Sequence, residues 1–282
     1  MTTPATISLA TWNIHKGFSQ FNRRVVVHEL RDRLRALGAD IVLLQEVQGQ
    51  HLKHPQRHAD WPDQPQHHFL AEEFWGNHAY GQNVAYDHGH HGNAILSRYP
   101  ILAEHNQNVT HYRFDQRGLL HCTIAVPNLS QPVHCVSVHL SLFAGSRRLQ
   151  LAALVDRIEA VVPSGAALVI AGDFNDWRNH ADELLAKRLG LHEAFTPKAG
   201  QRPAKSFPAS LPVLRLDRIY LRGFTVLERQ VHHGGIWAGI SDHAALSARV
   251  SASSLEIHSV TSAGHFRPDG LPVLSAPTEA LR

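Results

Sequence analysis

The sequence lacks any apolar run that approaches the ~20 residues needed to cross a membrane. Its first residues, 1–6, have neither a basic region nor a long apolar core, so we expect no signal peptide. Cysteine is scarce, since only Cys122 and Cys135 are present, in neighbouring strand-like runs. The two could face each other across a hairpin, but nothing suggests export, and we expect reduced core thiols. These absences predict a cytoplasmic protein.

Several common enzyme motifs are also missing. The absence of GxxxxGK(S/T), GxGxxG and GxSxG counts against nucleoside triphosphatases, dinucleotide-binding enzymes and serine hydrolases. The absence of HExxH counts against a catalytic zinc site. A strong charge of one sign is lacking too, because 27 basic residues stand against 24 acidic ones. This balance is compatible with a polyanionic substrate but is far from that of a dedicated DNA-coating protein.

Histidine, in contrast, is abundant, with 23 residues among 282. Many lie in clusters, as at 67–68, 88–91 and 232–233. We expect most of them to be polar loop residues, although any one cluster could do chemistry. Residues 51–68 are rich in His, Pro and Gln, which predicts a long loop at a substrate-facing rim.

Hydrophobic periodicity predicts an irregular alternation of strands and helices. Strands are expected over 7–12, 40–45, 119–126, 133–140, 166–171, 215–221, 225–230 and 244–250, with a strand pair, 84–86 and 93–97, around a loop. Helices are expected over 24–37, 147–162 and 182–189, with a short one over 72–78. This order predicts an α/β (α+β) fold of mixed sheets covered by helices. Residues 1–250 form one predicted domain, and the Ser/Ala/Pro-rich residues 251–282 a partly disordered tail.

Polar side chains of the metal-ligand type follow six separate apolar runs. They are Asn13, Glu46, His139, the pair Asp173 and Asn175, Asp217, and the pair Asp242 and His243. Each alone has an ordinary explanation, such as an Asp-rich turn for Asp173 or an arginine partner for Asp217. Six such positions in one chain favour a single site to which all of them contribute. Carboxylates and amides without cysteine suit a hard cation, Mg²⁺ or Mn²⁺.

The motifs around these residues resemble those of the endonuclease/exonuclease/phosphatase superfamily, which includes DNase I, AP endonucleases, sphingomyelinases and inositol polyphosphate 5-phosphatases. The segments that carry the resemblance are Thr11-Trp12-Asn13-Ile14, Leu44-Gln45-Glu46, Val138-His139-Leu140, Gly172-Asp173-Phe174-Asn175, Leu216-Asp217-Arg218-Ile219 and Ser241-Asp242-His243. The resemblance implies a DNase I-like, four-layer α/β/β/α sandwich, in which two mixed β-sheets are flanked by helices.

The resemblance also implies a role for each residue. Glu46 would be the principal Mg²⁺ ligand, completed by Asn13 and Asp242, and Mn²⁺ would substitute. Asp173 and Asn175 would position and activate the attacking water. His243, oriented by Asp217, would bind the phosphoryl oxygens, and His139 would lie near the leaving oxygen. The further phosphate contacts it implies are Arg117, Asn13 and Asn175.

Two departures narrow the resemblance. His15 stands where AP endonucleases carry an acidic residue, and His139 stands where they carry a tyrosine; both count against abasic-site repair. In its details the chain resembles a small bacterial branch marked by residues 13–18, 89–93 and 214–220. The candidates for substrate selection are the residues placed beside the shared site by this pattern, namely His15, Lys16, His90, His91 and Asn93. A solvated loop is the alternative for the histidine pair.

The sequence therefore predicts a Mg²⁺-dependent phosphoesterase, a hydrolase in which an activated water attacks phosphorus in line. A nuclease-type phosphodiesterase acting on nucleic acid is the first hypothesis. A phospholipid or phosphoinositide head group is the second possible substrate. A catalytically inactive binding protein is less favoured because no metal or phosphate residue of the motif set is missing. We expect a monomer.

Overall fold

Two six-stranded mixed β-sheets form the centre of the protein. The computed structural model describes residues 4–197, 203–237 and 239–253. One sheet has the order β11-β12-β1-β2-β4-β3 and the other β5-β6-β7-β8-β10-β9. Each sheet contains one parallel pair, β1 with β2 and β7 with β8, among antiparallel neighbours. The predicted mixed sheets are therefore present.

The strands are β1 (Thr6–Asn13), β2 (Ile41–His51), β3 (Asn77–Tyr86), β4 (Gly89–Ser97), β5 (Ile101–Asn108), β6 (Gly118–Ile124), β7 (Val133–His139), β8 (Leu168–Asp173), β9 (His192–Glu193), β10 (Asp217–Arg222), β11 (Phe224–His232) and β12 (Ala245–Ala252). The α-helices are α1 (Val27–Leu37), α2 (His54–Arg57), α3 (Gln66–Ala71), α4 (Ala144–Val161) and α5 (His180–Leu189). Short 3-10 helices are η1 (His15–Gly17), η2 (Gln20–Asn22) and η3 (Gly235–Trp237).

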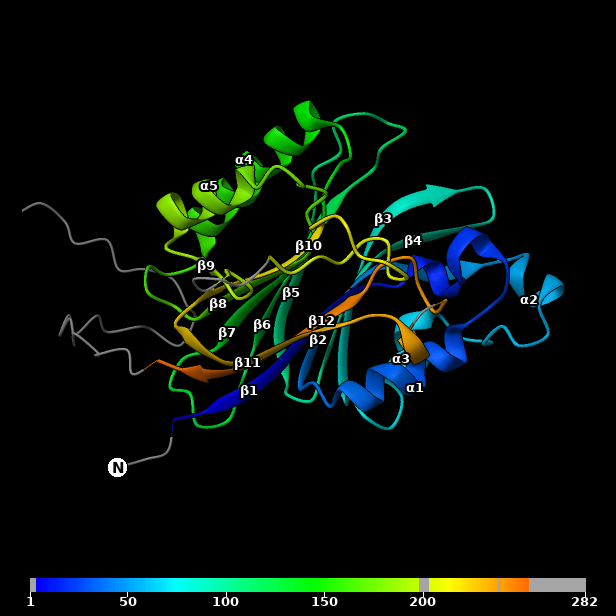
Figure 1. Cartoon of the computed structure of the whole chain (residues 1–282), viewed down its shortest axis with the longest axis horizontal. Coiled ribbons are helices and arrows are strands. Elements are labelled where there is room, and N and C mark those ends of the chain that lie inside the picture. Colours follow the sequence, from blue (N-terminus) through cyan, green and yellow to red (C-terminus); the bar gives the residue numbers. More distant parts are fainter. Residues whose placement is uncertain (1–3, 198–202, 238, 254–282) are drawn as a thin grey trace, which may run out of the picture.

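Alternation of side chains along each strand builds the layers. In β1, Leu9 points into the core between the two sheets, whereas Ala10 points to the core beneath α1 and α3. In β8, Val169 lies between the sheets and Ile170 packs under α4 and α5. Figure 1 shows α4 and α5 on one side of the strands and α1 and α3 on the other. The predicted four-layer α/β/β/α sandwich is confirmed.

The structure differs most from the sequence prediction in the polar regions of the chain. The expected helix over 72–78 is wrong, because the helix is α3, which ends at Ala71, and β3 begins at Asn77. The expected loop over 51–68 contains α2 and the start of α3. Strand β5 was not predicted, because its residues are mostly exposed and polar and show no apolar periodicity. The hairpin loop between β3 and β4 is also much shorter than expected.

Cys122 and Cys135 are directly paired across the β6–β7 hairpin. Both are buried free thiols, as expected, and burial raises the pKa of Cys122 to about 12. The last strand, β12, passes the expected domain boundary by two residues, and the remainder of the predicted tail after 253 lies outside the described residues. Among the residues that the structure describes, no helix is long and apolar enough to cross a membrane.

Candidate active site

The register of three strands brings His139, Asp173 and Asp217 to one edge of the second sheet. His139 is the last residue of β7 and Asp173 the last of β8, and the two pair in the parallel ladder. Asp217 opens β10 and pairs with Asp173 in the antiparallel ladder. Asn13 ends β1 of the other sheet, and its Nδ2 donates to Asp173 Oδ2 at 3.2 Å. The site therefore straddles the ends of both sheets.

A cavity of about 350 Å³ opens at this edge. The sequence analysis assigns nine residues to catalysis, phosphate binding or metal binding. Eight of these nine line the cavity, namely Asn13, Glu46, Arg117, His139, Asp173, Asn175, Asp242 and His243. Asp217 lies behind His243, which it contacts. Apolar side chains that the sequence analysis did not single out complete the wall, including Leu142, Trp177 and Phe207. These have no motif of their own, and only the fold places them here.

His243 is held by an ion pair with Asp217. Its Nδ1 lies 2.8 Å from Asp217 Oδ2, and its backbone oxygen accepts a hydrogen bond from Trp12 Nε1 at 2.8 Å. Burial by itself would lower the pKa of His243, but the carboxylates of Asp217 and Asp173 outweigh it and raise that pKa to about 10. Nε2 lies 3.8 Å from Asp173 Oδ2. His243 is therefore an imidazolium at neutral pH.

His139, in contrast, is a neutral imidazole at neutral pH. Its Nε2 lies 3.5 Å from Asp173 Oδ2. Burial, with help from the charge of Arg117, lowers the pKa of His139 to about 4, although Asp173 opposes this. Asp173 thus lies between one neutral and one charged imidazole, and burial raises its own pKa. Titratable neighbours whose pKa values are pushed apart are typical of acid–base sites.

Asn175 is fixed beside Asp173 in a left-handed backbone conformation with a φ of 49°. Its backbone N–H donates to Asp173 Oδ1 at 3.0 Å, and its side-chain Nδ2 donates to the carbonyl of Leu140 at 2.9 Å. The motif Gly-Asp-Phe-Asn thus forms a short turn that aims both polar residues at the cavity. A turn and a set of side chains directed at a site were alternative interpretations of this motif. Both are features of this one backbone conformation.

Glu46 sits at an irregularity of β2, where the register with β4 shifts between Leu44 and Val47. Its φ is 53°, which is unusual for a non-glycine residue and points to a functional constraint. Asn13 Nδ2 donates to Glu46 Oε1 at 3.4 Å, and Lys16 Nζ lies 2.6 Å from Oε2. Burial would raise the pKa of Glu46, but the charge and the hydrogen bond of Lys16 hold it well below its usual range.

The donor set fits a divalent cation. Glu46, Asn13 and Asp242 offer oxygen ligands into one cavity, which suits a hard ion such as Mg²⁺. Ser241 Oγ donates to the backbone oxygen of Asn13 at 2.7 Å and so joins the loop of Asp242 to the end of β1. The buried ligand atoms of Asp173, Asp217 and His243 also lie within 4.8 Å of one another. The Nδ1 of His243 is already used by Asp217, so we favour the first set.

The five candidates for substrate selection separate into two groups. Lys16 and His91 line the cavity. His15 does not, and its backbone N–H donates to Asn13 Oδ1 at 3.2 Å. His90 was expected in a loop but belongs to β4, and Asn93, with which the expected strand 93–97 begins, lies in the same strand. His90 Nδ1 lies 2.9 Å from the hydroxyl of Tyr80, and Asn93 is fully buried, where its amide donates to the carbonyls of Gly118 and Ser137.

A second cavity, of about 420 Å³, shares Lys16 and His91 with the first. Its other lining residues are Phe18, Asn22, Gln48, His51, His54, His58 and Tyr86. Three of these histidines come from the segment 51–68 that the sequence predicts at a substrate-facing rim. Burial is the main cause that lowers the pKa of His54 and of His91 to about 4, so these imidazoles are neutral.

The comparisons with known proteins agree with this fold. Residues 10–243 match the model of the endonuclease/exonuclease/phosphatase family. The uncharacterized protein YbhP of Escherichia coli (strain K12) is 45% identical over 240 residues, which cover 85% of this chain and 94% of that protein. The Shigella flexneri protein of the same name matches equally well. The chain belongs to the endonuclease/exonuclease/phosphatase family.

Solved structures show the same fold at low sequence identity. An endonuclease/exonuclease/phosphatase from Beutenbergia cavernae superposes with a TM-score of 0.69 and 20% identity, covering 88% of this chain and 72% of that one. Humanized D. rerio TDP2 superposes with a TM-score of 0.64 and 19% identity, covering 88% and 99%. At these identities the likeness shows the DNase I-like fold alone.

Proposed function

We propose that the protein is a divalent-cation-dependent phosphodiesterase of the nuclease type. The observation that carries this proposal is the position of Asp173 between a neutral His139 and a charged His243, in the same cavity as Glu46 and Asn13. A phosphate ester in this cavity meets both a group that can take a proton and a group that can stabilise negative charge.

The residues divide the reaction between them. Asp173 accepts a proton from the attacking water, whose oxygen forms a bond to phosphorus as the bond to the leaving oxygen breaks. The imidazolium of His243 donates a hydrogen bond to a phosphoryl oxygen, where negative charge increases in the transition state. The resemblance leaves two roles for His139 near the leaving oxygen, general acid or stabiliser. Its pKa of about 4 favours the second, in which the neutral His139 donates a hydrogen bond near the leaving oxygen, which takes its proton from solvent.

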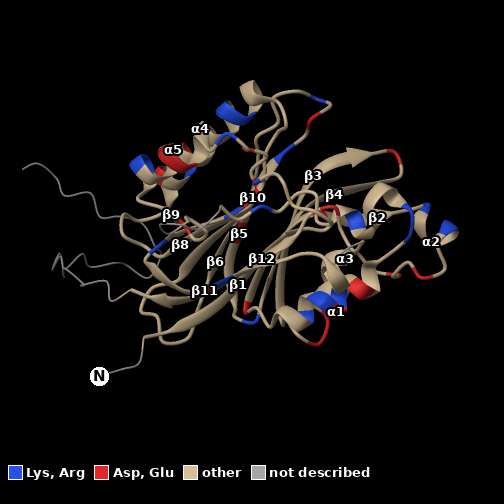
Figure 2. Ribbon diagram, in the orientation of Figure 1, with Lys and Arg blue, Asp and Glu red and all other residues tan. Residues whose placement is uncertain are grey.

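Glu46, Asn13 and Asp242 would hold Mg²⁺ or Mn²⁺, which when bound would neutralise negative charge on the phosphate. Arg117 lines the same cavity and adds a second fixed positive charge for the phosphate. Its guanidinium pairs with Asp115 at 2.9 Å, which keeps the side chain in place. Charges of both signs are otherwise mixed over the ribbon, as the alternating colours along α1 and α5 in Figure 2 show. The attraction for a polyanion is therefore local to the site.

The second cavity favours nucleic acid as the substrate. It opens beside the catalytic cavity and is lined by several imidazoles and by the exposed ring of Tyr86. Flat aromatic surfaces next to a phosphate site suit stacking with nucleobases, which contributes about 1–3 kcal/mol per base. A base attached to the scissile phosphate would fit there.

A phospholipid head group is the second candidate substrate, and a different feature favours it. Phe114 and Phe143, which are 73% and 52% exposed, lie with their ring centroids 6.0 Å apart. Phe143 follows Leu142, which lines the catalytic cavity and is also exposed. Exposed apolar side chains beside a phosphate site could insert into a lipid surface.

A substrate panel tests both candidates. It contains plasmid DNA, single-stranded RNA, abasic duplex, phosphoinositide, sphingomyelin and a generic aryl phosphodiester, each with Mg²⁺ and with Asp173→Asn as the inactive control. We expect cleavage of DNA or RNA by the wild type alone. Cleavage restricted to the lipids would replace the first candidate by the second. Equal rates for wild type and Asp173→Asn on every substrate would show that the site assignment is wrong.

A further inference from the structure

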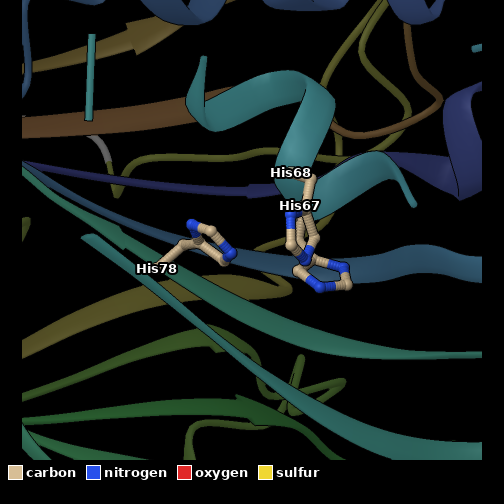
Figure 3. A group of neighbouring side chains, drawn as sticks. All are labelled: His67, His68 and His78. Atoms are coloured by element: carbon tan, nitrogen blue, oxygen red, sulfur yellow. The ribbon is translucent and has the colours of Figure 1, made fainter. Parts of the chain in front are cut away.

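Three histidines gather on the flank of the first sheet, away from the catalytic cavity. His67 and His68 are consecutive in α3, and His78 follows the start of β3. One ring nitrogen from each lies within 4.8 Å of the others. Figure 3 shows the ring of His78 directed from its strand toward the rings that descend from α3. The three residues line neither cavity described above.

His67 is the residue that makes this group unusual. Its side chain is only 8% exposed, and its ring stacks on that of Tyr80 with centroids 4.5 Å apart and planes 8° apart. Its Nδ1 is buried without a hydrogen-bond partner. A buried polar atom without a partner costs about 1–3 kcal/mol. Such an atom requires an explanation, and a missing ion is one of the common ones.

The rings of His67 and His78 are available as ligands at neutral pH. Burial lowers the pKa of His67 to about 3, and burial also lowers the pKa of His78. A metal ligand must be a neutral imidazole, so no proton has to be displaced from these two. His68 is exposed, which leaves a route for an ion to enter.

We propose that His67, His68 and His78 form a binding site for a transition-metal dication of the Zn²⁺ class. Three imidazoles without carboxylate ligands select Zn²⁺, Ni²⁺ or Cu²⁺ over Mg²⁺. Zinc–nitrogen distances of about 2.0–2.1 Å need the ligand atoms roughly 3.3 Å apart in a tetrahedron. The ligand atoms, which lie within 4.8 Å of one another, have to move closer together when a metal binds. A water completes the fourth position.

Metal binding would affect the catalytic cavity through the contacts that α3 makes with other parts of the chain. This helix has only six residues and no side-chain cap, so it depends on outside contacts for stability. Its first residue, Gln66, donates from Nε2 to the backbone oxygen of Lys16 at 2.8 Å and accepts from the backbone N–H of Gln48 at 2.8 Å. Lys16 in turn pairs with Glu46 in the catalytic cavity. A metal ion bound by both α3 and β3 therefore holds Gln66 in place, and through Gln66 the backbone at Lys16.

The test uses the full chain, stripped with a chelator and kept in saturating Mg²⁺ so that the oxygen ligands of the catalytic cavity are occupied. Zn²⁺ is titrated against a chromophoric competitor for wild type, His68→Gln and His78→Gln. The matched control is His105→Gln, which changes an exposed histidine outside the group. The buried His67 is left unchanged because its substitution could impair folding.

We expect wild type and His105→Gln to bind one Zn²⁺ at least tenfold more tightly than His68→Gln and His78→Gln. Zn²⁺ should also raise the melting temperature of the first two proteins and not of the other two, which is a readout independent of catalysis. Equal Zn²⁺ affinity and equal melting shifts in all four proteins would overturn the proposal. So would the absence of Zn²⁺ binding in the wild type.

Discussion

The Nδ1 of His243 lies 2.8 Å from Oδ2 of Asp217, although the two residues come from different sheets. Asp217 begins β10 and His243 precedes β12, so the hydrogen bond joins the two sheets at the catalytic edge. The backbone N–H of Asp217 donates to Ser206 Oγ at 3.1 Å, which holds the backbone of Asp217 in place. The protonation state of His243 is thus set by a residue that does not line the cavity.

Substitution Asp217→Asn should lower kcat by about 10–100-fold, the usual effect of losing a partner that orients a functional histidine. The pKa of His243 should fall because one of its two stabilising carboxylates is lost. The high-pH limb of the pH–rate profile should then move to lower pH. The exposed Asp156→Asn on α4 serves as the control. An unchanged profile in Asp217→Asn would contradict the assigned role.

Removal of the metal should abolish hydrolysis. We expect EDTA to inactivate the protein and Mg²⁺ or Mn²⁺ to restore it, because the oxygen ligands of Glu46, Asn13 and Asp242 suit hard cations. Glu46→Gln should require a much higher Mg²⁺ concentration for half-maximal activity, measured by titration after chelation. Full activity of the chelated wild type would rule out a metal-dependent reaction.

Lys16→Met should strengthen metal binding at the catalytic cavity. Lys16 Nζ lies 2.6 Å from Glu46 Oε2 and competes for the carboxylate with a cation. A partly exposed ion pair contributes about 1 kcal/mol or less, so the expected gain in Mn²⁺ affinity is at most about fivefold. Electron paramagnetic resonance of free Mn²⁺ measures this affinity. Lys187→Met removes an equally basic side chain on α5 and should leave the affinity unchanged.

Gly172→Ala should unfold or strongly destabilise the protein. Gly172 has a φ of 146°, and a Cβ built on it lies 2.0 Å from the backbone oxygen of Val138 on the neighbouring strand. The resulting strain in the β7–β8 ladder should lower the free energy of unfolding by more than about 2 kcal/mol, measured by urea denaturation. Gly145→Ala in α4 meets no atom within 4 Å and should be neutral or slightly stabilising.

Stability should fall in acid partly through His121. Burial, with the neighbouring His134, lowers the pKa of His121 to about 4. The unfolded chain takes up a proton near the ordinary value of about 6.5. The stabilising contribution is therefore complete above pH 6.5 or so and is lost as the pH falls to about 4, by up to about 3 kcal/mol. In His121→Gln the dependence of unfolding free energy on pH should be weaker by about one proton, whereas an unchanged slope would exclude His121 as a cause.

The parts of the fold that follow from apolar periodicity were predicted well from the sequence. The alternation of Leu9 with Ala10, and the apolar run that ends at Asp173, define strands that bury side chains on both faces. Some buried positions in β4 and α3 do not follow apolar periodicity, because Asn93, Gln66 and His67 are polar residues and are nevertheless buried. Periodicity of apolar residues carries no signal for them, so α3 was misplaced and the burial of Asn93 was not predicted.

The sequence by itself determined the fold class, the family and the set of polar strand ends, because each follows from local patterns and motifs. The tertiary structure alone decided how these groups act on one another. It placed Asp217 against His243 and Arg117 near His139, and so shifted the pKa values of the two histidines beside Asp173 in opposite directions. Protonation depends on burial and on charges within a few ångströms, and these distances exist only once β1, β7, β8 and β10 meet at one edge.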